Sequence, residues 1–156
     1  MRSDSAYEIE VTGAEGVPDV DADAIRRAVE GALRHRACAR AQISVALIDD
    51  DAIAELNQRF LGHEGSTDVL SFDLSDAPDS GAVDGEVVIS ADTARREAAA
   101  RRHPAAHELL LYAVHGTLHL LGMDDQTEIG AAEMHAIENE ILTGMGIGPV
   151  YGAEPR

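Results

Sequence analysis

The segment from Pro104 to Gly122 is the feature that most constrains the fold of this chain. At helical spacing, its apolar residues cover nearly every side: Leu109, Leu110, Leu111, Val114, Leu118, Leu120 and Leu121. A helix that is apolar almost all round is usually buried. Pro104 suits the first position of a helix, where a missing N–H costs nothing. The sequence therefore predicts a buried helix from about Pro104 to Gly122, with other elements packed around it.

Two histidines lie within this apolar helix. His115 and His119 are four residues apart, which places both imidazoles on one face with their Cβ atoms about 5–6 Å apart. Buried polar rings are costly unless they have partners. One interpretation is a pair of hydrogen-bonded core histidines. The other, which we favour, is a pair of ligands to one metal ion.

A turn after the helix can supply a third ligand. Gly122 permits a left-handed helix end, and the turn can bring Asp124 or Asp125 toward the two histidines. Two histidines and one carboxylate leave the fourth position of a tetrahedral ion for water, which is the arrangement of catalytic zinc. The segment therefore predicts an open metal site.

The residue after His115 argues against a peptidase. It is Gly116, so the glutamate of the metalloprotease pattern H-E-x-x-H is missing from its usual place. Glu108 lies along the same helix face as the histidines and could orient a ligand or move protons. For Glu108 we favour a structural role.

The rest of the chain predicts a small sheet with helices. Alternating or apolar runs predict four strands: Tyr7–Val11, Ile43–Ile48, Val69–Phe72 and Glu86–Ser90, the last of them central. Helical spacing and capping residues predict helices from about Asp23, after Asp49 (with Ile53, Leu56 and Phe60), over Asp92–Arg102 and over Thr127–Leu142. Residues 75–84 predict a loop.

These elements define the expected fold class. It is α+β, a small mixed four-stranded sheet packed with about five helices, with the metal site on the buried helix. We expect one domain over residues 1–156, with an irregular tail over about 144–156 that is rich in Gly and Pro.

Composition excludes several classes of protein. No run of about 18 apolar residues occurs, and the N-terminus has no apolar stretch of signal-peptide length, so we expect no membrane span and a cytoplasmic location. The formal net charge of -17 argues against general attraction to duplex DNA. Aromatic residues make up only 3% of the chain, which argues against a broad base-stacking platform.

All twelve positively charged residues are arginine. Nine of them fall in two clusters: Arg26, Arg27, Arg34, Arg36 and Arg40, and Arg95, Arg96, Arg101 and Arg102. The simpler interpretation is solvated helix faces. The alternative is two local phosphate-contact patches, since the guanidinium fork fits phosphate oxygens.

The segment from His115 to Asp125 resembles the signature of the YbeY family, bacterial endoribonucleases involved in ribosomal RNA maturation. The family pattern reads roughly H-G-x-L-H-L-x-G-Y-D-H, and this chain matches it at His115, Gly116, Leu118, His119, Leu120, Gly122 and Asp124. Upstream runs resemble further family elements in the same order: Leu56–Asn57, Thr67–Phe72 and Gly85–Ser90. The similarity spans roughly residues 45–142.

The resemblance implies a metal-dependent endoribonuclease that cleaves single-stranded RNA. Its context would be precursor ribosomal RNA and the small ribosomal subunit or its assembly factors. The resemblance implies one zinc ion held by His115, His119 and Asp125, because Asp125 stands where the family has its third histidine. Aspartate is an acceptable zinc ligand, but as a harder donor it loosens the selectivity for zinc. Asp124 is then expected to accept backbone hydrogen bonds in the turn.

A second departure from the family pattern is at Leu61. Family members commonly carry an arginine there, linked to RNA cleavage, and a lysine where this chain has His63. Arg59 lies two positions earlier and points another way on a helix. Developing negative charge at phosphorus needs a cation. Arg59 is therefore a candidate catalytic residue, with the Arg95–Arg102 cluster as an alternative.

Two other functions stay open. A metal-dependent hydrolase of a peptide or an ester predicts a closed cleft without a basic rim. A non-catalytic ribosome-assembly factor, which keeps its metal for folding, predicts a fourth protein ligand that closes the ion: Asp124, His107 or His135.

Overall fold

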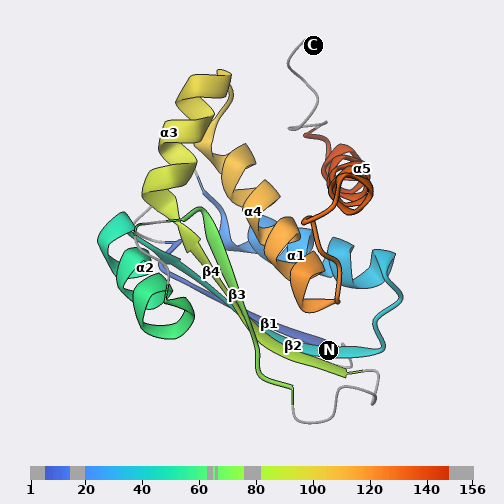
Figure 1. Cartoon of the computed structure of the whole chain (residues 1–156). Helices are drawn as coiled ribbons and strands as arrows, with labels where there is room; N and C mark the ends of the chain where they lie inside the picture. The colour runs from blue at the N-terminus through green and yellow to red at the C-terminus, as the bar shows by residue number, and fades with distance from the viewer. Residues whose placement is uncertain (1–5, 15–19, 63–64, 66, 76–81, 148–156) are drawn as a thin grey trace.

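The computed structural model describes residues 6–14, 20–62, 65, 67–75 and 82–147. Strands and helices follow one another along the chain as β1 (Tyr7–Thr12), α1 (Ala22–His35), β2 (Arg40–Ile48), α2 (Asp50–Leu56), β3 (Val69–Asp73), β4 (Ala82–Ser90), α3 (Ala91–Arg101), α4 (Ala105–Leu120) and α5 (Glu128–Gly144) (Figure 1). The α+β fold class is confirmed. The part of the expected tail over 148–156 lies outside the described residues.

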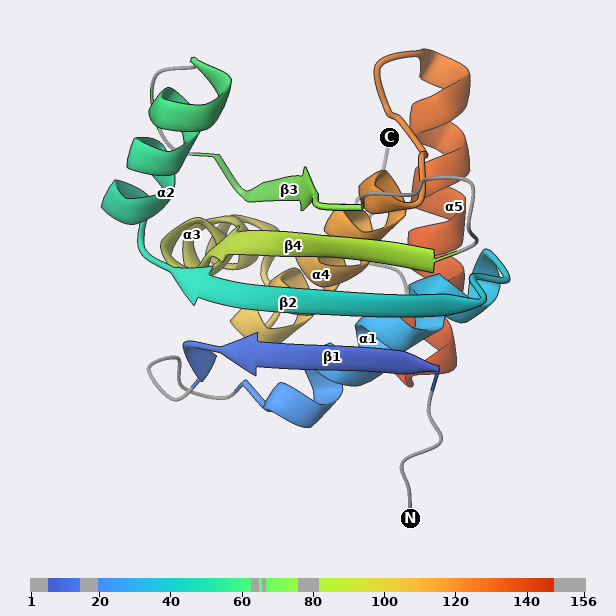
Figure 2. The same cartoon turned by 90° about the horizontal axis from the view of Figure 1, so that it is seen from below.

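The sheet is mixed and has four strands in the order β1-β2-β4-β3 (Figure 2). β1 pairs in parallel with β2, and β2 pairs in parallel with β4. β3 is antiparallel to β4 and forms one edge. The apolar run Glu86–Ser90 therefore belongs to an inner strand, as its sequence predicts.

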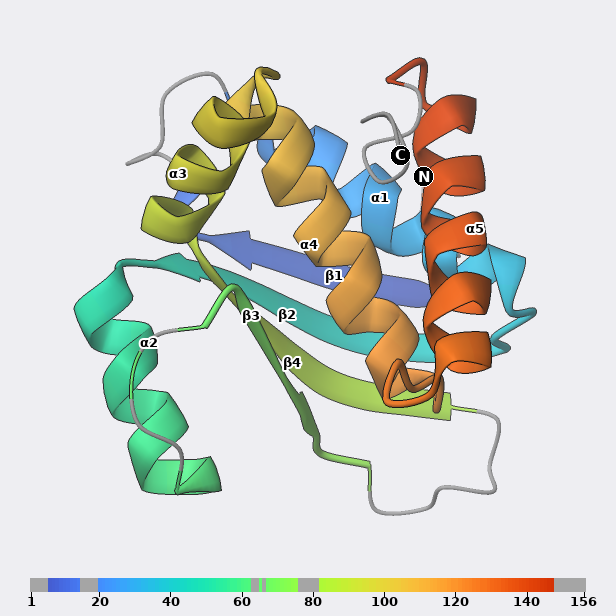
Figure 3. The same ribbon diagram turned by 45° about the horizontal axis from the view of Figure 1, so that its top comes forward.

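Helix α4 lies at the centre of the molecule and contacts α1, α3, α5, β3 and β4 (Figure 3). The predicted burial on nearly every side is confirmed, because its leucines at 109, 110, 111, 118 and 120 are all buried. Although α4 is very apolar, no helix in the described part of the chain is both long enough and apolar enough to cross a membrane.

A glycine lets α4 approach the sheet closely. A Cβ atom at Gly116 would lie 2.6 Å from Cγ1 of Val87 in β4 and 3.1 Å from Oγ of Ser71 in β3. The Ser71 hydroxyl donates a hydrogen bond to the Gly116 carbonyl at 2.8 Å. Contact distances this short leave no room for a side chain, so glycine is required here by packing rather than by its backbone conformation.

The two faces of the sheet are covered unequally. Successive residues of β4 alternate between them: Val87 and Ile89 join the main core under α1 and α4, and Val88 joins a smaller cluster with Ile53 and Leu70. The smaller cluster lies beneath α2. The main core is therefore the side of the sheet that carries the histidine helix.

The helix after Asp49 and the loop before β4 differ in detail from expectation. The helix after Asp49 continues beyond α2 as a π-helical turn, Asn57–Leu61, which ends at Gly62 in the left-handed conformation. Phe60, which lies in this turn, is 58% exposed, and its ring meets that of Phe72 edge to face with centroids 5.7 Å apart. The predicted loop over residues 75–84 is also shorter, because β4 begins at Ala82 to pair with β2; residues 76–81 lie outside the described part.

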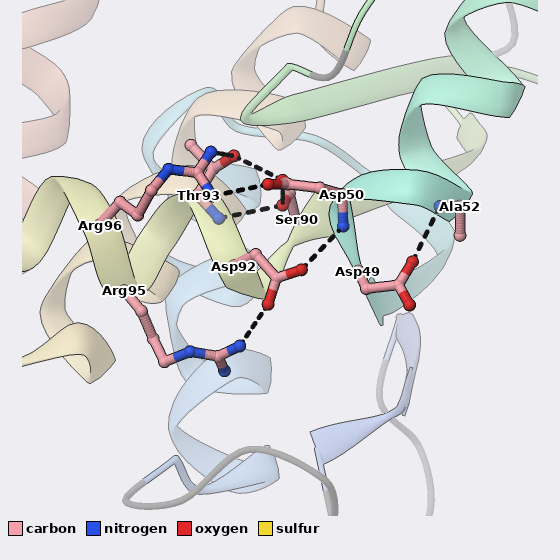
Figure 4. A network of polar contacts seen from close by, with 8 residues as sticks. All are labelled: Asp49, Asp50, Ala52, Ser90, Asp92, Thr93, Arg95 and Arg96. Atoms are coloured by element: carbon pink, nitrogen blue, oxygen red, sulfur yellow. Dashed lines mark hydrogen bonds and ion pairs between the residues drawn. The ribbon is translucent and has the colours of Figure 1, made fainter.

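A polar network joins the start of α2 to the start of α3 (Figure 4). Asp50 Oδ1 accepts hydrogen bonds from the hydroxyls of Ser90 at 2.6 Å and Thr93 at 2.9 Å. Arg96 donates to Asp50 Oδ2 at 2.6 Å, and the Asp50 N–H donates to Asp92 at 3.0 Å. Because α2 covers the sheet face only at one end, this network fixes where the helix and the following π-helical turn lie.

We predict that Asp50→Asn destabilises the fold by about 1–2 kcal/mol, the value of hydrogen bonds to a partly exposed charged group. The asparagine amide can still accept from the hydroxyls but presents N–H to Arg96. Chemical denaturation measures the change. Asp51→Asn, an exposed acid in the same helical turn, is the matched control, and an equal loss there would contradict the role of the network.

The pH dependence of this difference follows from the pKa of Asp50. Its hydrogen bonds with Ser90 and Arg96 lower that pKa below the ordinary 3.8, against the opposing effect of partial burial. A lowered folded-state pKa contributes stability above the unfolded-state pKa and loses it as the pH falls through the folded-state value. We therefore expect the gap between wild type and Asp50→Asn to be constant near pH 7 and to close below about pH 4.

Candidate metal centre

Three side chains predicted as ligands lie together at one end of α4. The Nε2 atoms of His115 and His119 are 3.1 Å apart, and their rings meet edge to face. The two carboxylate oxygens of Asp125 lie 3.4 Å from His115 Nε2 and 3.8 Å from His119 Nε2. One ligand atom of each residue lies within 4.8 Å of the others, so this group could hold one metal ion.

The turn after α4 brings the aspartate to the histidines. Gly122 has a φ of +93°, as the sequence predicts, and the Met123 N–H donates to the Leu118 carbonyl at 3.0 Å. This is a Schellman helix end, which reverses the chain. Asp124 Oδ1 accepts from the Gln126 N–H at 2.6 Å. Asp124 therefore stabilises the turn, as expected, and Asp125 faces the site.

The far nitrogen of each imidazole has a hydrogen-bond acceptor. His119 Nδ1 donates to the Met123 carbonyl at 3.1 Å, and His115 Nδ1 donates to Glu138 Oε2 at 2.6 Å. With Nδ1 carrying the proton, the neutral ring offers a lone pair at Nε2. Two lone pairs 3.1 Å apart repel each other unless a cation lies between them. The donor set therefore fits a metal ion, and in its absence one shared proton.

The charges around His115 favour a positive ring. Burial of this side chain opposes protonation, but the hydrogen bond with Glu138 and the negative charges of Glu138 and Asp125 outweigh it. Together they raise the pKa of His115 above its ordinary value. The same negative charges attract a metal cation to Nε2.

The cluster opens into a cleft of about 420 Å³ between α4 and the edge strand β3. The cleft is lined by Asp68, Val69, Leu70, Ser71, Asp73, His115, His119, Leu120 and Asp125. The position after His115 does not face it, because Gly116 packs against the sheet. A glutamate base of the H-E-x-x-H kind would therefore find no space there.

None of the side chains suggested as a fourth ligand joins the cluster in the described part of the chain. Asp124 accepts a hydrogen bond within the turn, and His107 packs beside His103 with ring centroids 6.1 Å apart. The group of possible ligands around His115 and His119 thus has three members, among the residues that the structure describes.

Glu108 has the structural role that we favoured. Its side chain is fully buried. One carboxylate oxygen lies 2.5 Å from His103 Nε2, and the other accepts from Arg101 at 3.3 Å. Glu108 is absent from the lining of the metal cleft.

The arginines considered as candidate cations form ion pairs away from the His115–His119–Asp125 cluster. Arg59 pairs with Glu55 at 3.2 Å and does not line the metal cleft. Arg96 pairs with Asp50, as described above, and Arg101 pairs with Glu97 and Glu108. In the Arg95–Arg102 cluster the structure thus favours salt-bridged helix faces over a phosphate patch. The described lining of the cleft contains no arginine; His63 lies outside the described residues.

Sequence reasoning missed Glu138. It lies on α5 and is fully buried, in contact with His115. A signal was present, since Met134, Glu138 and Leu142 follow one another at intervals of four residues. An acid in the middle of an apolar helix stripe needs a partner, and the unexplained acid could have been paired with the histidines.

The fold and the site together define a class: an α+β protein with a buried helix that carries an open His–His–Asp cluster. The family model for the endoribonuclease YbeY matches residues 12–146. This chain belongs to the YbeY family.

Individual relatives agree with this assignment. An endoribonuclease YbeY from Parvibaculum lavamentivorans is 38% identical over an alignment of length 162, gaps included, which covers 96% of this chain and 88% of the relative. One from Moorella thermoacetica is 45% identical over 116 residues, covering 69% of this chain and 74% of the relative. The solution structure of a Thermotoga maritima protein superposes with a TM-score of 0.60 at 23% identity, covering 94% of this chain and 97% of that one. That structure supports the fold.

We predict that His115→Ala and His119→Ala each abolish stoichiometric metal binding, because each removes one of the two facing Nε2 donors. Metal content after purification measures the loss. Metal at a hundredfold excess over its Kd should stabilise wild type by about 2.7 kcal/mol and stabilise neither variant. One equivalent of metal in either variant would show that the site is misassigned.

The two aspartates in the turn provide a matched pair. Asp125→Asn should weaken metal binding by more than about tenfold, because it removes the charge that faces both histidines. Asp124→Asn should leave affinity near wild type, since an amide oxygen can still accept from the Gln126 N–H. Competition with a chromogenic chelator compares them. A larger loss in the Asp124 variant would refute the assignment of Asp125.

Proposed function

We propose that this chain is a metal-dependent endoribonuclease that cleaves single-stranded RNA during ribosomal RNA processing. The observation that carries the proposal is the three-membered His115–His119–Asp125 cluster at the wall of a cleft in a chain of the YbeY family. Three protein ligands leave a position open, as catalysis requires.

We assign His115, His119 and Asp125 as ligands of one zinc ion. Two imidazoles and a carboxylate suit zinc, although the carboxylate also accommodates harder metals. When bound, such an ion supplies a Lewis acid and a water of lowered pKa. The chain itself holds these donors in place. The Met123 carbonyl orients the ring of His119 and the Glu138 carboxylate orients the ring of His115, each by accepting a hydrogen bond from Nδ1.

The negative net charge of the protein repels RNA that approaches this site. The net charge is -17, and Asp68 and Asp73 also line the cleft. Attraction of the phosphodiester therefore depends on local cations, which include the metal itself and, as we propose, Arg59. Arg59 is 61% exposed at its side chain and held only by Glu55 and by its contact with the ring of Phe60, among the described residues. Because this ion pair is exposed and therefore weak, a phosphate can compete with Glu55 for the Arg59 guanidinium.

Two alternative functions require a different site from the one that the structure has or a different substrate. A non-catalytic assembly factor requires a closed site, and the three-membered cluster favours an open one. A hydrolase of a peptide or an ester predicts a cleft without a basic rim. The described residues that line the cleft agree with this, because they include no arginine. Membership of the YbeY family favours RNA as the substrate.

The family context extends the proposal to partners and location. We propose ribosomal RNA and the small ribosomal subunit, or its assembly factors, as partners in the cytoplasm. We also propose that residues 1–156 act as a single domain.

The deciding experiment combines metal analysis with RNA cleavage. Purified full-length protein should contain one equivalent of zinc and should cut a single-stranded ribosomal RNA fragment. A chelator should stop cleavage and zinc should restore it. Metal-loaded protein that cuts no RNA would favour the assembly factor, and cleavage of esters but not RNA would favour the other hydrolase.

We predict that Leu61→Arg accelerates cleavage of single-stranded RNA. Leu61 is 49% exposed, and the groove beside Phe60 adjoins the metal cleft at Ser71 and Asp73. A guanidinium near the developing charge is worth about 2–4 kcal/mol, or roughly a 30- to 1,000-fold gain in rate. Single-turnover cleavage at equal zinc content measures the effect.

Two further variants act as controls for this prediction. Gln58→Arg adds the same charge to an exposed neighbouring position and should change the rate little. If Arg59 supplies a cation for the developing charge as well as for binding of the RNA, Leu61→Arg will change little and Arg59→Ala will cripple cleavage. That outcome would contradict the prediction for Leu61.

A further inference from the structure

We propose that Glu138 is the positioning residue of the metal centre: its buried carboxylate fixes the ring and tautomer of His115 and thereby sets the affinity of the cluster for metal. This inference rests on the metal site of the proposed function and adds a residue on α5 to it. The side chain of Glu138 is fully buried, and its Oε2 lies 2.6 Å from His115 Nδ1.

The surroundings of Glu138 do not explain a buried charge. The neighbouring inward positions on α5 are apolar and buried: Met134, Ile141 and Leu142. Glu138 Oε1 has no hydrogen-bond partner in the part of the chain that the structure describes. A buried carboxylate with one partner costs several kcal/mol unless a positive charge offsets it. Packing and fold stability alone would favour an apolar residue here.

A second buried acid, Glu108, has the charge compensation that Glu138 lacks. Glu108 is equally buried, but its two oxygens contact His103 and the guanidinium of Arg101. Its charge is therefore compensated inside the protein. For Glu138 the described residues provide only the ring of His115. The compensating charge must come through that ring, from a metal ion or a proton at its Nε2 atom.

The hydrogen bond also decides which nitrogen of His115 is available. Because Nδ1 donates to the carboxylate, the lone pair of Nε2 points toward His119 and Asp125. A negative acceptor makes the ring a stronger donor to metal than a neutral one. His119 has only the neutral carbonyl of Met123 behind it. Of the two imidazoles, His115 is therefore the stronger donor to a metal ion.

The experiment compares Glu138→Gln with Glu140→Gln in the full-length chain. Glutamine keeps the size of the side chain and an oxygen for the Nδ1 proton, but removes the charge. Glu140 is an exposed acid on the same helix, 3.4 Å from His35, and serves as the control. Zinc affinity is measured by competition with a chromogenic chelator, and the free energy of unfolding is measured in excess chelator.

We expect Glu138→Gln to weaken zinc binding by about 10- to 100-fold, the usual effect of removing a carboxylate behind a metal-binding histidine. The metal-free variant should lose less free energy of unfolding than its loss of zinc affinity corresponds to, because glutamine still accepts from His115 Nδ1 and leaves no buried charge behind. Glu138→Asp keeps the charge but shortens the reach and should fall between the two in affinity. Glu140→Gln should change neither measurement.

The opposite pattern would overturn the inference. If Glu138→Gln binds zinc like wild type, or if its metal-free form is less stable by as much as its affinity falls, Glu138 is a structural residue only. Wild-type protein that binds no zinc would instead refute the metal site itself. The two failures are therefore distinguishable without any measurement of RNA cleavage.

Discussion

The close approach of α4 to the sheet is the constraint on which the rest of this structure depends. Gly116 allows the helix backbone to lie against Val87 and Ser71 without an intervening side chain. With this side of α4 pressed against the sheet, the histidine pair faces the gap beside the edge strand β3. The packing requirement and the site therefore share one helix turn, since the residue directly after His115 must be small for the histidine pair to face the cleft.

The electrostatics of the cleft suit a metal cation better than a nucleic acid. Asp125 and the buried Glu138 surround the facing imidazoles with negative charge. The Arg95–Arg102 cluster, which could have offset this charge for an RNA strand, is held in salt bridges at Arg95, Arg96 and Arg101. Leu61, where the resemblance to the family implies an arginine, carries no charge. The three candidate metal ligands thus lie together, while the described residues that line the cleft include no arginine.

Helix α5 also contributes to the candidate metal centre. The turn that leads into α5 supplies Asp125, and the helix itself supplies Glu138 behind His115. The contrast with Glu108 shows that the protein accommodates buried acids in two ways. One acid is compensated by an arginine and a histidine within the fold, and the other depends on the charge of a histidine at the site.

The sequence by itself determined the features that depend on residues a few positions apart. The apolar surface of α4, the shared face of His115 and His119 and the reversal at Gly122 all follow from helix geometry, and the structure has each of them. Tertiary structure decided what depends on distant residues. β4 begins at Ala82 because β2 is there to pair with it, and the helix after Asp49 widens into a π-helical turn that carries the exposed Phe60. Glu138 meets His115 across 23 positions of the chain, a contact that no local periodicity encodes because it exists only once α5 has packed against α4.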